Sequence, residues 1–227
     1  MARNALVVRG GWEGHQPVAA TDLFIPFLRD QGFDVRVADS PEPYADAGYM
    51  AGVDLVVQCV SMSTITGEQC AGLSAAVRAG TGLAGWHGGI CDSYRNNTDY
   101  LHLVGGQFAC HPGKPIEEWV DGAEENVFVP YRVEIVAKDH PITAGVPDFD
   151  LVTEQYWVLS DEYNEVLATT THPARDAWRR PVTVPAIWTR SWGNGRVFVA
   201  TPGHDLRTLR DANVRTVIER GMVWASR

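Results

Sequence analysis

The chain has 227 residues, of which 45% are hydrophobic and 21% are charged, and its formal net charge is −9 at pH 7. This composition is typical of a globular protein and excludes global disorder. The acidic balance argues against a general nucleic-acid or anionic-membrane binder, because both need a basic face. The sequence contains no Pro/Gly/Ser-rich linker and no internal repeat, so we expect a single domain over residues 1–227.

The N-terminus leads into a strand-like stretch of five residues (5–9), which is too short for the apolar core of a signal peptide. No apolar run approaches the ~20 residues of a membrane span. We therefore expect a cytoplasmic protein with no membrane partner. The cysteines form no CxxC pair, so we expect reduced thiols and no zinc ribbon. They are Cys59, Cys70, Cys91 and Cys110.

The first half of the chain alternates strand-like and helix-like segments. Its predicted strands are residues 4–9, 33–38, 53–60 and 82–86, and its predicted helices are residues 18–31 and 66–78. Gly32 should end the first helix, and Pro26 should bend that helix or mark its start. Alternation of this kind predicts parallel β-α units, with helices on both faces of a doubly wound sheet.

The second half is richer in strands. The predicted strands are residues 127–137, 151–158, 165–170, 186–190 and 196–200, and a final helix covers 211–225. Asn194-Gly195 is a strong two-residue hairpin signal between the last two strands. We expect these strands to extend the parallel sheet in an antiparallel manner. Ligands of such sheets bind at the carboxyl ends of the parallel strands.

Four histidines lie in loops that directly follow apolar segments: His15, His87, His111 and His204. Because the carboxyl ends of parallel strands meet at one edge, at least three of these imidazoles should converge. Convergent imidazoles can act in acid/base catalysis or bind a metal ion. The other three histidines, His102, His140 and His172, fit structural positions on a helix or in X-Pro turns better than a site.

His87 has the most suggestive local sequence, Gly85-Trp86-His87-Gly88-Gly89. A residue between a strand and a helix, flanked by glycines, has the geometry of a nucleophile elbow. Here the elbow residue is an imidazole, which suits general acid/base chemistry. The alternative is that the glycines only permit close packing of the helix on the sheet.

The other loop histidines also have structural alternatives. His15 could be a turn or capping residue, and His111 could be buried. The carboxylate of Asp205 could orient His204, or Asp205 could instead cap a helix.

Glu154 is the strongest candidate acid, because it lies among apolar and aromatic residues in Leu151-Val152-Thr153-Glu154-Gln155-Tyr156-Trp157-Val158. A salt bridge to an arginine such as Arg190 is the alternative. Aromatic side chains near these groups suit stacking on sugar rings, although they could equally belong to the core. They are Trp12, Trp86, Tyr156 and Trp157.

Cysteine catalysis is a rival hypothesis, since Cys91 lies four residues after His87 and Cys110 adjoins His111. No cysteine is at the elbow itself, so a core role is favoured for each. The sequence has no Walker A, GxGxxG or HExxH motif, and nucleotide binding therefore has no support.

An ordered set of motifs resembles the ThuA (trehalose utilisation) family nearly end to end. The set comprises the glycine-rich loop with His15, Gly82-Leu83-Ala84-Gly85-Trp86-His87-Gly88-Gly89, Gly105-Gly106-Gln107-Phe108 with His111-Pro112, Asp139-His140-Pro141-Ile142-Thr143-Ala144-Gly145, Glu154-Gln155-Tyr156, Pro185-Ala186-Ile187-Trp188-Thr189, Gly193-Asn194-Gly195-Arg196-Val197-Phe198 and Gly203-His204-Asp205. The resemblance implies a flavodoxin-like three-layer α/β sandwich with a mainly parallel central sheet, similar to class I glutamine amidotransferases. Those enzymes carry a cysteine nucleophile where this chain has His87, so the resemblance does not imply glutaminase activity. It does imply a link to sugar catabolism.

We therefore expect an enzyme, a hydrolase or an isomerase, that acts on a small-molecule carbohydrate or keto-sugar. His87 and Glu154 would be the acid/base groups. The expected substrate contacts are Trp12, His15, Trp86, His111, Tyr156, Trp157 and His204. The expected ligands of a divalent metal such as zinc are His15, His87, His111 and His204. A non-catalytic sugar-binding or regulatory module is the alternative, a cysteine-dependent amidase is the least favoured reading, and a homodimer is expected from base rates alone.

Overall fold

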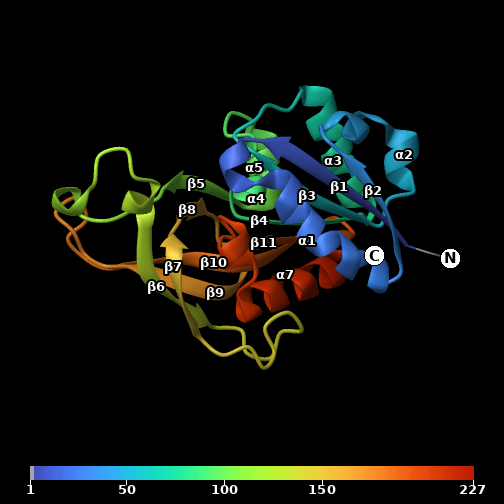
Figure 1. Ribbon diagram of the computed structural model, residues 1–227. Coiled ribbons are helices and arrows are strands. Elements are labelled where there is room, and N and C mark those ends of the chain that lie inside the picture. Colours follow the sequence, from blue (N-terminus) through green and yellow to red (C-terminus); the bar gives the residue numbers. More distant parts are fainter. Residues whose placement is uncertain (1–2) are drawn as a thin grey trace.

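A nine-stranded sheet forms the centre of the protein (Figure 1), whose computed structural model describes residues 3–227. Five neighbouring strands of this sheet run parallel. In spatial order they are β2 (Phe33–Ala38), β1 (Arg3–Gly11), β3 (Leu55–Ser61), β4 (Gly82–Trp86) and β11 (Gly195–Ala200). Every residue of β3 and β4 is buried, as expected for strands covered on both faces.

Four antiparallel strands continue the sheet beyond β11. They are β10 (Val182–Trp192), β9 (Glu165–His172), β6 (Phe128–Ile135) and β7 (Phe149–Glu154). The predicted hairpin at Asn194-Gly195 is confirmed, because β10 and β11 pair antiparallel with Trp192 opposite Gly195. A separate two-stranded sheet joins β5 (Gly106–Cys110) to β8 (Trp157–Ser160).

Helices cover both faces of the parallel strands. One face packs against α1 (Pro17–Asp30), α6 (Leu206–Leu209) and α7 (Ala212–Ala225). The other packs against α2 (Ala47–Ala51), α3 (Gly67–Ala79), α4 (Gly88–Cys91) and α5 (Thr98–Val104). The result is a mixed α/β architecture with the two hydrophobic cores on opposite sides of the sheet. Among residues 3–227, none of the helices has the length and apolar character that crossing a bilayer requires.

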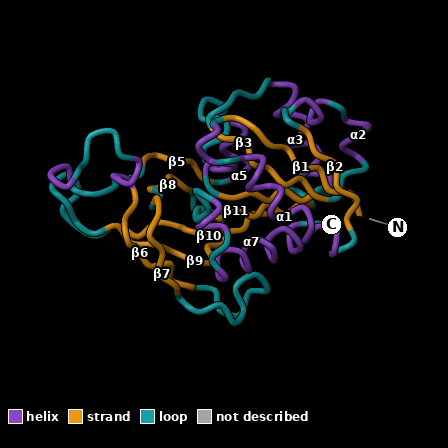
Figure 2. Tube along the Cα trace, viewed as in Figure 1, coloured by secondary structure: helices purple, strands orange, loops and turns teal. Residues whose placement is uncertain are grey.

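The remaining helical elements are short 3-10 turns. They are η1 (Glu13–His15), η2 (Glu42–Ala45), η3 (Ile116–Glu118) and η4 (Glu124–Val127). The last two belong to residues 111–127, which we call the lobe. The lobe extends at the left of Figure 1 and is mostly loop in Figure 2.

Two predictions about elements are wrong. The predicted strand 151–158 is two strands, because β7 pairs with β6 whereas β8 pairs with β5, so the chain crosses between sheets at Gln155 and Tyr156. Pro26 does not mark the start of α1, since Pro17 occupies the first turn and Pro26 lies inside the helix. Gly32 follows α1 with φ 82°, as expected of a glycine after a helix.

Candidate functional site

Three imidazoles and one carboxylate meet at the carboxyl edge of the parallel strands. His15, His87, His204 and Glu154 each offer one ligand atom, and these atoms all lie within 4.8 Å of one another. All four side chains are buried. The predicted convergence of at least three histidines is therefore observed, and a predicted acid lies with them.

The parallel strands place the three histidines. His15 lies in η1, just after β1 turns at Gly10 and Gly11. His87 follows the last residue of β4, and His204 follows β11 after a short turn. Because β1, β4 and β11 run in the same direction, the loops after them share one edge of the sheet.

Glu154 reaches the cluster from the antiparallel half of the sheet. It is the last residue of β7, at the point where the chain leaves the large sheet for the small one. The alternative that Glu154 pairs with Arg190 is wrong. Arg190 instead donates to Asp161 at 2.7 Å and to Asn164 at 2.9 Å.

The backbone at His87 has the predicted elbow character. Its φ of 49° and ψ of −140° are rare for a residue with a side chain, and such conformations cost on the order of 1–3 kcal/mol. The His87 amide donates to the Ala200 carbonyl at 2.7 Å, which holds the turn. Gly88 is required by the same packing, because a Cβ there would lie 2.3 Å from Cε1 of His15.

Each imidazole is anchored through one of its nitrogens. His87 Nδ1 donates to the Thr201 carbonyl at 2.7 Å, so Nε2 is the nitrogen that faces the cluster. His15 Nδ1 lies 2.7 Å from the hydroxyl oxygen of Ser61. His204 Nε2 lies 3.0 Å from Oε1 of Glu124. Such outer contacts orient the imidazoles of metal sites.

One carboxylate oxygen faces two of these imidazoles. Oε2 of Glu154 lies 3.0 Å from Nε2 of His87 and 3.3 Å from Nδ1 of His204. Nδ1 of His204 makes no hydrogen bond within the part of the chain that the structure describes. Since the opposite nitrogens of both rings are already committed, a positive charge, either a proton or a metal ion, must lie between this oxygen and the rings.

Burial and mutual repulsion decide how these groups titrate. Burial, together with the neighbouring imidazoles, lowers the pKa of His15 to about 2. Burial also lowers the pKa of His87, against the opposing effect of Glu154. For His204 the effect of burial is outweighed by Glu154 and Glu124, which raise its pKa. Burial would raise the pKa of Glu154, but its contacts with His204 and His87 dominate and lower it.

A cleft of about 640 Å³ opens above Glu154. Trp12 and His111 line it, as predicted for substrate contacts, and the ring of Trp12 meets His15 edge-on. Tyr156 lies beneath the cluster, with its ring stacked 4.1 Å from that of His87. His111 Nε2 lies 3.7 Å from Oε1 of Glu154.

His111 does not belong to the group of four, contrary to the prediction that it is a metal ligand. It follows β5 of the small sheet rather than a parallel strand, so it approaches Glu154 from the cleft. Its side chain is 35% exposed, whereas His15, His87 and His204 are buried. The alternative that His111 is buried does not hold, because its side chain is partly exposed.

Of the predicted substrate contacts, only Trp12 and His111 line this cleft. His15, Tyr156 and His204 lie in or against the buried cluster, and Trp86 and Trp157 lie apart from it. Trp86 is buried in the core on the α1 face of the sheet, with its ring centre 4.8 Å from that of Phe24. Trp157 begins β8, and its ring stacks on His172 and meets Trp178 edge-on. Both residues are near the site in sequence, but their side chains point elsewhere.

The sequence predicted no role for three residues that the structure places at the site. Ser61 ends β3 at the same edge as the histidines, so the argument from strand ends could have found it. Glu124 and Trp119 lie in the lobe and line the cleft. The lobe has no regular periodicity, so nothing in the sequence indicates that it folds back over the histidines.

Contacts and burial bear on two of the remaining alternatives. Asp205 caps α6 by accepting from the Thr208 amide at 2.7 Å, so Glu124 rather than Asp205 contacts His204. Cys59 lies on β3 and Cys91 ends α4; both are buried, and burial raises the pKa of Cys59 to about 12. A thiol of this kind is a poor nucleophile.

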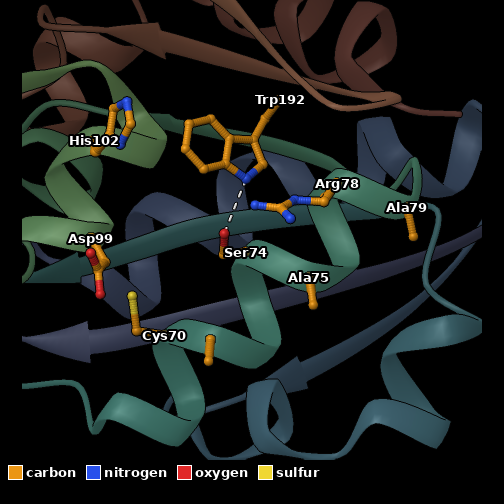
Figure 3. A pocket seen from close by; sticks show the side chains of 9 residues that line it. Cys70, Ser74, Ala75, Arg78, Ala79, Asp99, His102 and Trp192 are labelled. Atoms are coloured by element: carbon orange, nitrogen blue, oxygen red, sulfur yellow. Dashed lines mark hydrogen bonds between the residues drawn. The ribbon is translucent and has the colours of Figure 1, made fainter.

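A second cavity, of about 690 Å³, lies between α3, α5 and the end of β10 (Figure 3). The indole nitrogen of Trp192 donates to Ser74 there, and the ring of Trp192 meets that of His102 edge-on. The cavity contains no convergent set of imidazoles and carboxylates among the described residues, so we place the candidate site at the cluster instead.

Comparisons with known proteins agree with this architecture. A ThuA-like protein from Bacteroides uniformis is 19% identical, with a TM-score of 0.77 over 98% of this chain and 91% of its own. A ThuA-like protein from Parabacteroides merdae is 19% identical, with a TM-score of 0.72 over 99% and 90% of the two chains. A cytoplasmic protein from Salmonella typhimurium LT2 is 14% identical, with a TM-score of 0.65 over 99% and 100%. At these identities the likeness concerns the fold alone.

No curated protein matches the sequence significantly. The sequence model of the ThuA family, described as trehalose utilisation, matches residues 4–225. Because this match covers almost the whole sequence, the chain belongs to the ThuA family.

Proposed function

We propose that this protein binds and transforms a carbohydrate or keto-sugar at a divalent-metal centre made by His15, His87, His204 and Glu154. The observation that carries the proposal is the convergence of their ligand atoms within 4.8 Å of one another. Three imidazoles and one carboxylate suit Zn²⁺ or a similar transition metal. Membership in a family described as trehalose utilisation supports a sugar as the substrate class.

The arrangement of donor atoms at the cluster suits a metal ion. Burial and the neighbouring imidazoles lower the pKa of His15 to about 2, so this imidazole is neutral, which is the form that binds metals. Burial also lowers the pKa of His87. Nδ1 of His204 is buried without a hydrogen-bond partner among the described residues and faces Glu154. A divalent cation would satisfy this nitrogen, Nε2 of His87 and the carboxylate together.

A metal ion at this position would polarise a substrate carbonyl or hydroxyl group, or lower the pKa of a bound water. His111 then remains as the imidazole that moves protons, because it lies on the cleft side of Glu154 and is partly exposed. Without a metal, His87 and Glu154 would themselves form the acid/base pair. The metal content of the purified protein separates these two mechanisms.

The walls of the cleft support a sugar ligand. Trp12 and Trp119 are 42% and 48% exposed, and both line the cleft that leads to Glu154. Exposed indole faces beside polar groups such as Gln16 and Asn126 suit the alternating apolar and hydroxyl surfaces of a sugar ring. The substrate would therefore stack between the N-terminal loop and the lobe.

Two finer points accompany this proposal. The order β2-β1-β3-β4-β11 of the parallel strands supports a flavodoxin-like arrangement of that half of the sheet.

A cytoplasmic location is favoured by the similarity to a Salmonella protein described as cytoplasmic.

Metal analysis of the purified protein, prepared without a polyhistidine tag, tests the centre. We expect about one zinc or similar ion per chain by mass spectrometry, with loss of the ion in His15→Ala and His204→Ala. His102→Ala is the matched control, because His102 lies outside the cluster against Trp192, and it should keep the ion. A wild-type protein that stays metal-free and gains no thermal stability from added zinc would refute the centre.

Incubation with trehalose and with its 3-keto derivative, followed by NMR, tests the substrate class. We expect saturable binding and product formation, with Trp12→Ala and Trp119→Ala each weakening binding by about tenfold if stacking contributes roughly 1.4 kcal/mol. Trp192→Ala, in the other cavity, should bind like the wild type. Binding without any product would instead identify a non-catalytic sugar-binding module.

A further inference from the structure

One imidazole of the cluster depends on the lobe for its outer contact. His87 and His15 are anchored by Thr201 and Ser61, which belong to the strand ends or follow them directly. His204 is anchored by Glu124, which lies 80 positions earlier in the chain, in η4. The side chain of Glu124 makes no other hydrogen bond among the described residues, and it is 57% exposed.

The lobe holds Glu124 in place through its own internal contacts. The side chain of Asn126 accepts from the Val120 amide at 2.8 Å and donates to the Val120 carbonyl at 2.6 Å. The Lys114 amide donates to the Asn126 carbonyl at 2.8 Å. These bonds close the lobe into a loop that presents Glu124 to His204.

The contact decides which nitrogen of His204 is free. A carboxylate only accepts, so Nε2 of His204 carries the proton that it donates to Glu124. Nδ1 is then the nitrogen with the lone pair, and it is the buried atom 3.3 Å from Oε2 of Glu154 that has no hydrogen-bond partner within residues 3–227. His87 presents the opposite nitrogen, Nε2, to the same oxygen, so the two rings need different tautomers.

Charge balance favours the same arrangement. Three neutral imidazoles and Glu154 leave one positive charge on a divalent cation, and Glu124 supplies the second negative charge through His204. Carboxylates that bind the far nitrogen of a ligating imidazole raise its basicity, and removing them typically weakens metal binding about 10–100-fold.

We propose that Glu124 is a positioning residue that fixes His204 as an Nδ1 ligand and thereby couples closure of the lobe to metal binding. This inference rests on the proposed metal centre. Because coupling is reciprocal, the bound metal must also stabilise the lobe in its closed position. The lobe lines the cleft, so the metal and the substrate cleft are completed together.

The test compares zinc affinities, measured by competition with a chromophoric chelator, for three variants. Glu124→Ala should bind zinc about 10–100-fold more weakly than the wild type. Glu124→Gln should recover part of this loss, because its amide oxygen still accepts from Nε2. Glu125→Ala is the matched control: it removes the same charge from the neighbouring exposed position and should stay within about twofold of the wild type.

Amide hydrogen exchange supplies a readout that general destabilisation would not reproduce. Zinc should slow exchange across residues 116–127 in the wild type and in Glu125→Ala, but not in Glu124→Ala. Zinc affinity of Glu124→Ala equal to that of the wild type, or an equal loss in Glu125→Ala, would overturn the inference while leaving the metal centre standing. A wild-type protein that binds no zinc would overturn the proposed function as well.

Discussion

The substitution Gly88→Ala tests the geometry of the cluster with a single added methyl group. The Cβ of alanine would lie 2.3 Å from Cε1 and 2.6 Å from Nδ1 of His15. Ordinary carbon contacts are about 3.5 Å, so the imidazole of His15 must move by roughly 1.2 Å. Gly88 does not have a positive φ, so the alanine backbone itself is unstrained and the effect comes from the collision.

A displacement of this size removes His15 from a metal centre, since ligand distances tolerate only about 0.2 Å. We expect zinc affinity to fall by more than about 100-fold, because loss of a ligand exceeds the effect of an outer contact. Overpacking should also cost about 1–3 kcal/mol, which lowers Tm by roughly 2–12 °C in a domain of this size. Chelator competition and differential scanning calorimetry measure the two effects.

Gly67→Ala is the matched control, because a Cβ added at Gly67, at the start of α3, would meet nothing within 4 Å. It should keep wild-type zinc affinity and equal or slightly exceed wild-type stability. Wild-type zinc affinity in Gly88→Ala would show that His15 is not a ligand and would refute the reasoning.

Zinc at a free concentration 100 times its Kd should stabilise the wild type by about 2.7 kcal/mol, raising Tm by roughly 5–11 °C in a thermal melt; an unchanged Tm would contradict specific binding to the folded state. Asp161→Asn should lower stability at pH 7, because the bond from buried Arg190 lowers the pKa of Asp161. Because the pKa of Asp161 is lowered in the folded state, its contribution to stability is present above the unfolded value near 3.8 and is lost as pH falls through the folded-state pKa. The difference between the two proteins in urea unfolding should therefore be largest at pH 7 and should shrink as the pH is lowered below 3.8. Iodoacetamide should label exposed Cys110 first, whereas Cys59 and Cys91 should react only on unfolding, as peptide mass spectrometry would show; early labelling of Cys59 would contradict its burial.

The sequence predicts the parallel half of the fold well, because its signals are local. Continuous apolar runs such as 53–60 mark buried strands, and turns follow each of them. The same logic locates three of the four cluster residues, since His15, His87 and His204 each follow a parallel strand. The flanking glycines also indicate the elbow at His87, and its positive φ agrees with that prediction.

The positions of the other site residues depend on contacts between segments that are far apart in the sequence, which local patterns do not predict. The apolar neighbours of Glu154 predict a perturbed acid, but its meeting with His87 depends on where β7 ends against β6. The approach of Glu124 to His204 depends on how the lobe closes, and no periodicity in the lobe encodes that closure. Trp86 and Trp157 are predicted from their proximity to the site in the sequence, but their rings pack against Phe24 and His172 instead of the cleft.

The order in which the ribosome synthesises the chain determines when the four side chains of the cluster can come together. His15 emerges early, whereas His204 is made only shortly before the final helix, α7. No partial chain that ends before residue 204 can therefore assemble all four side chains, and the site stays incomplete until His204 has been added. An ion that needs all four side chains would thus bind only late in folding, after the segments that carry His15 and His204 have packed together.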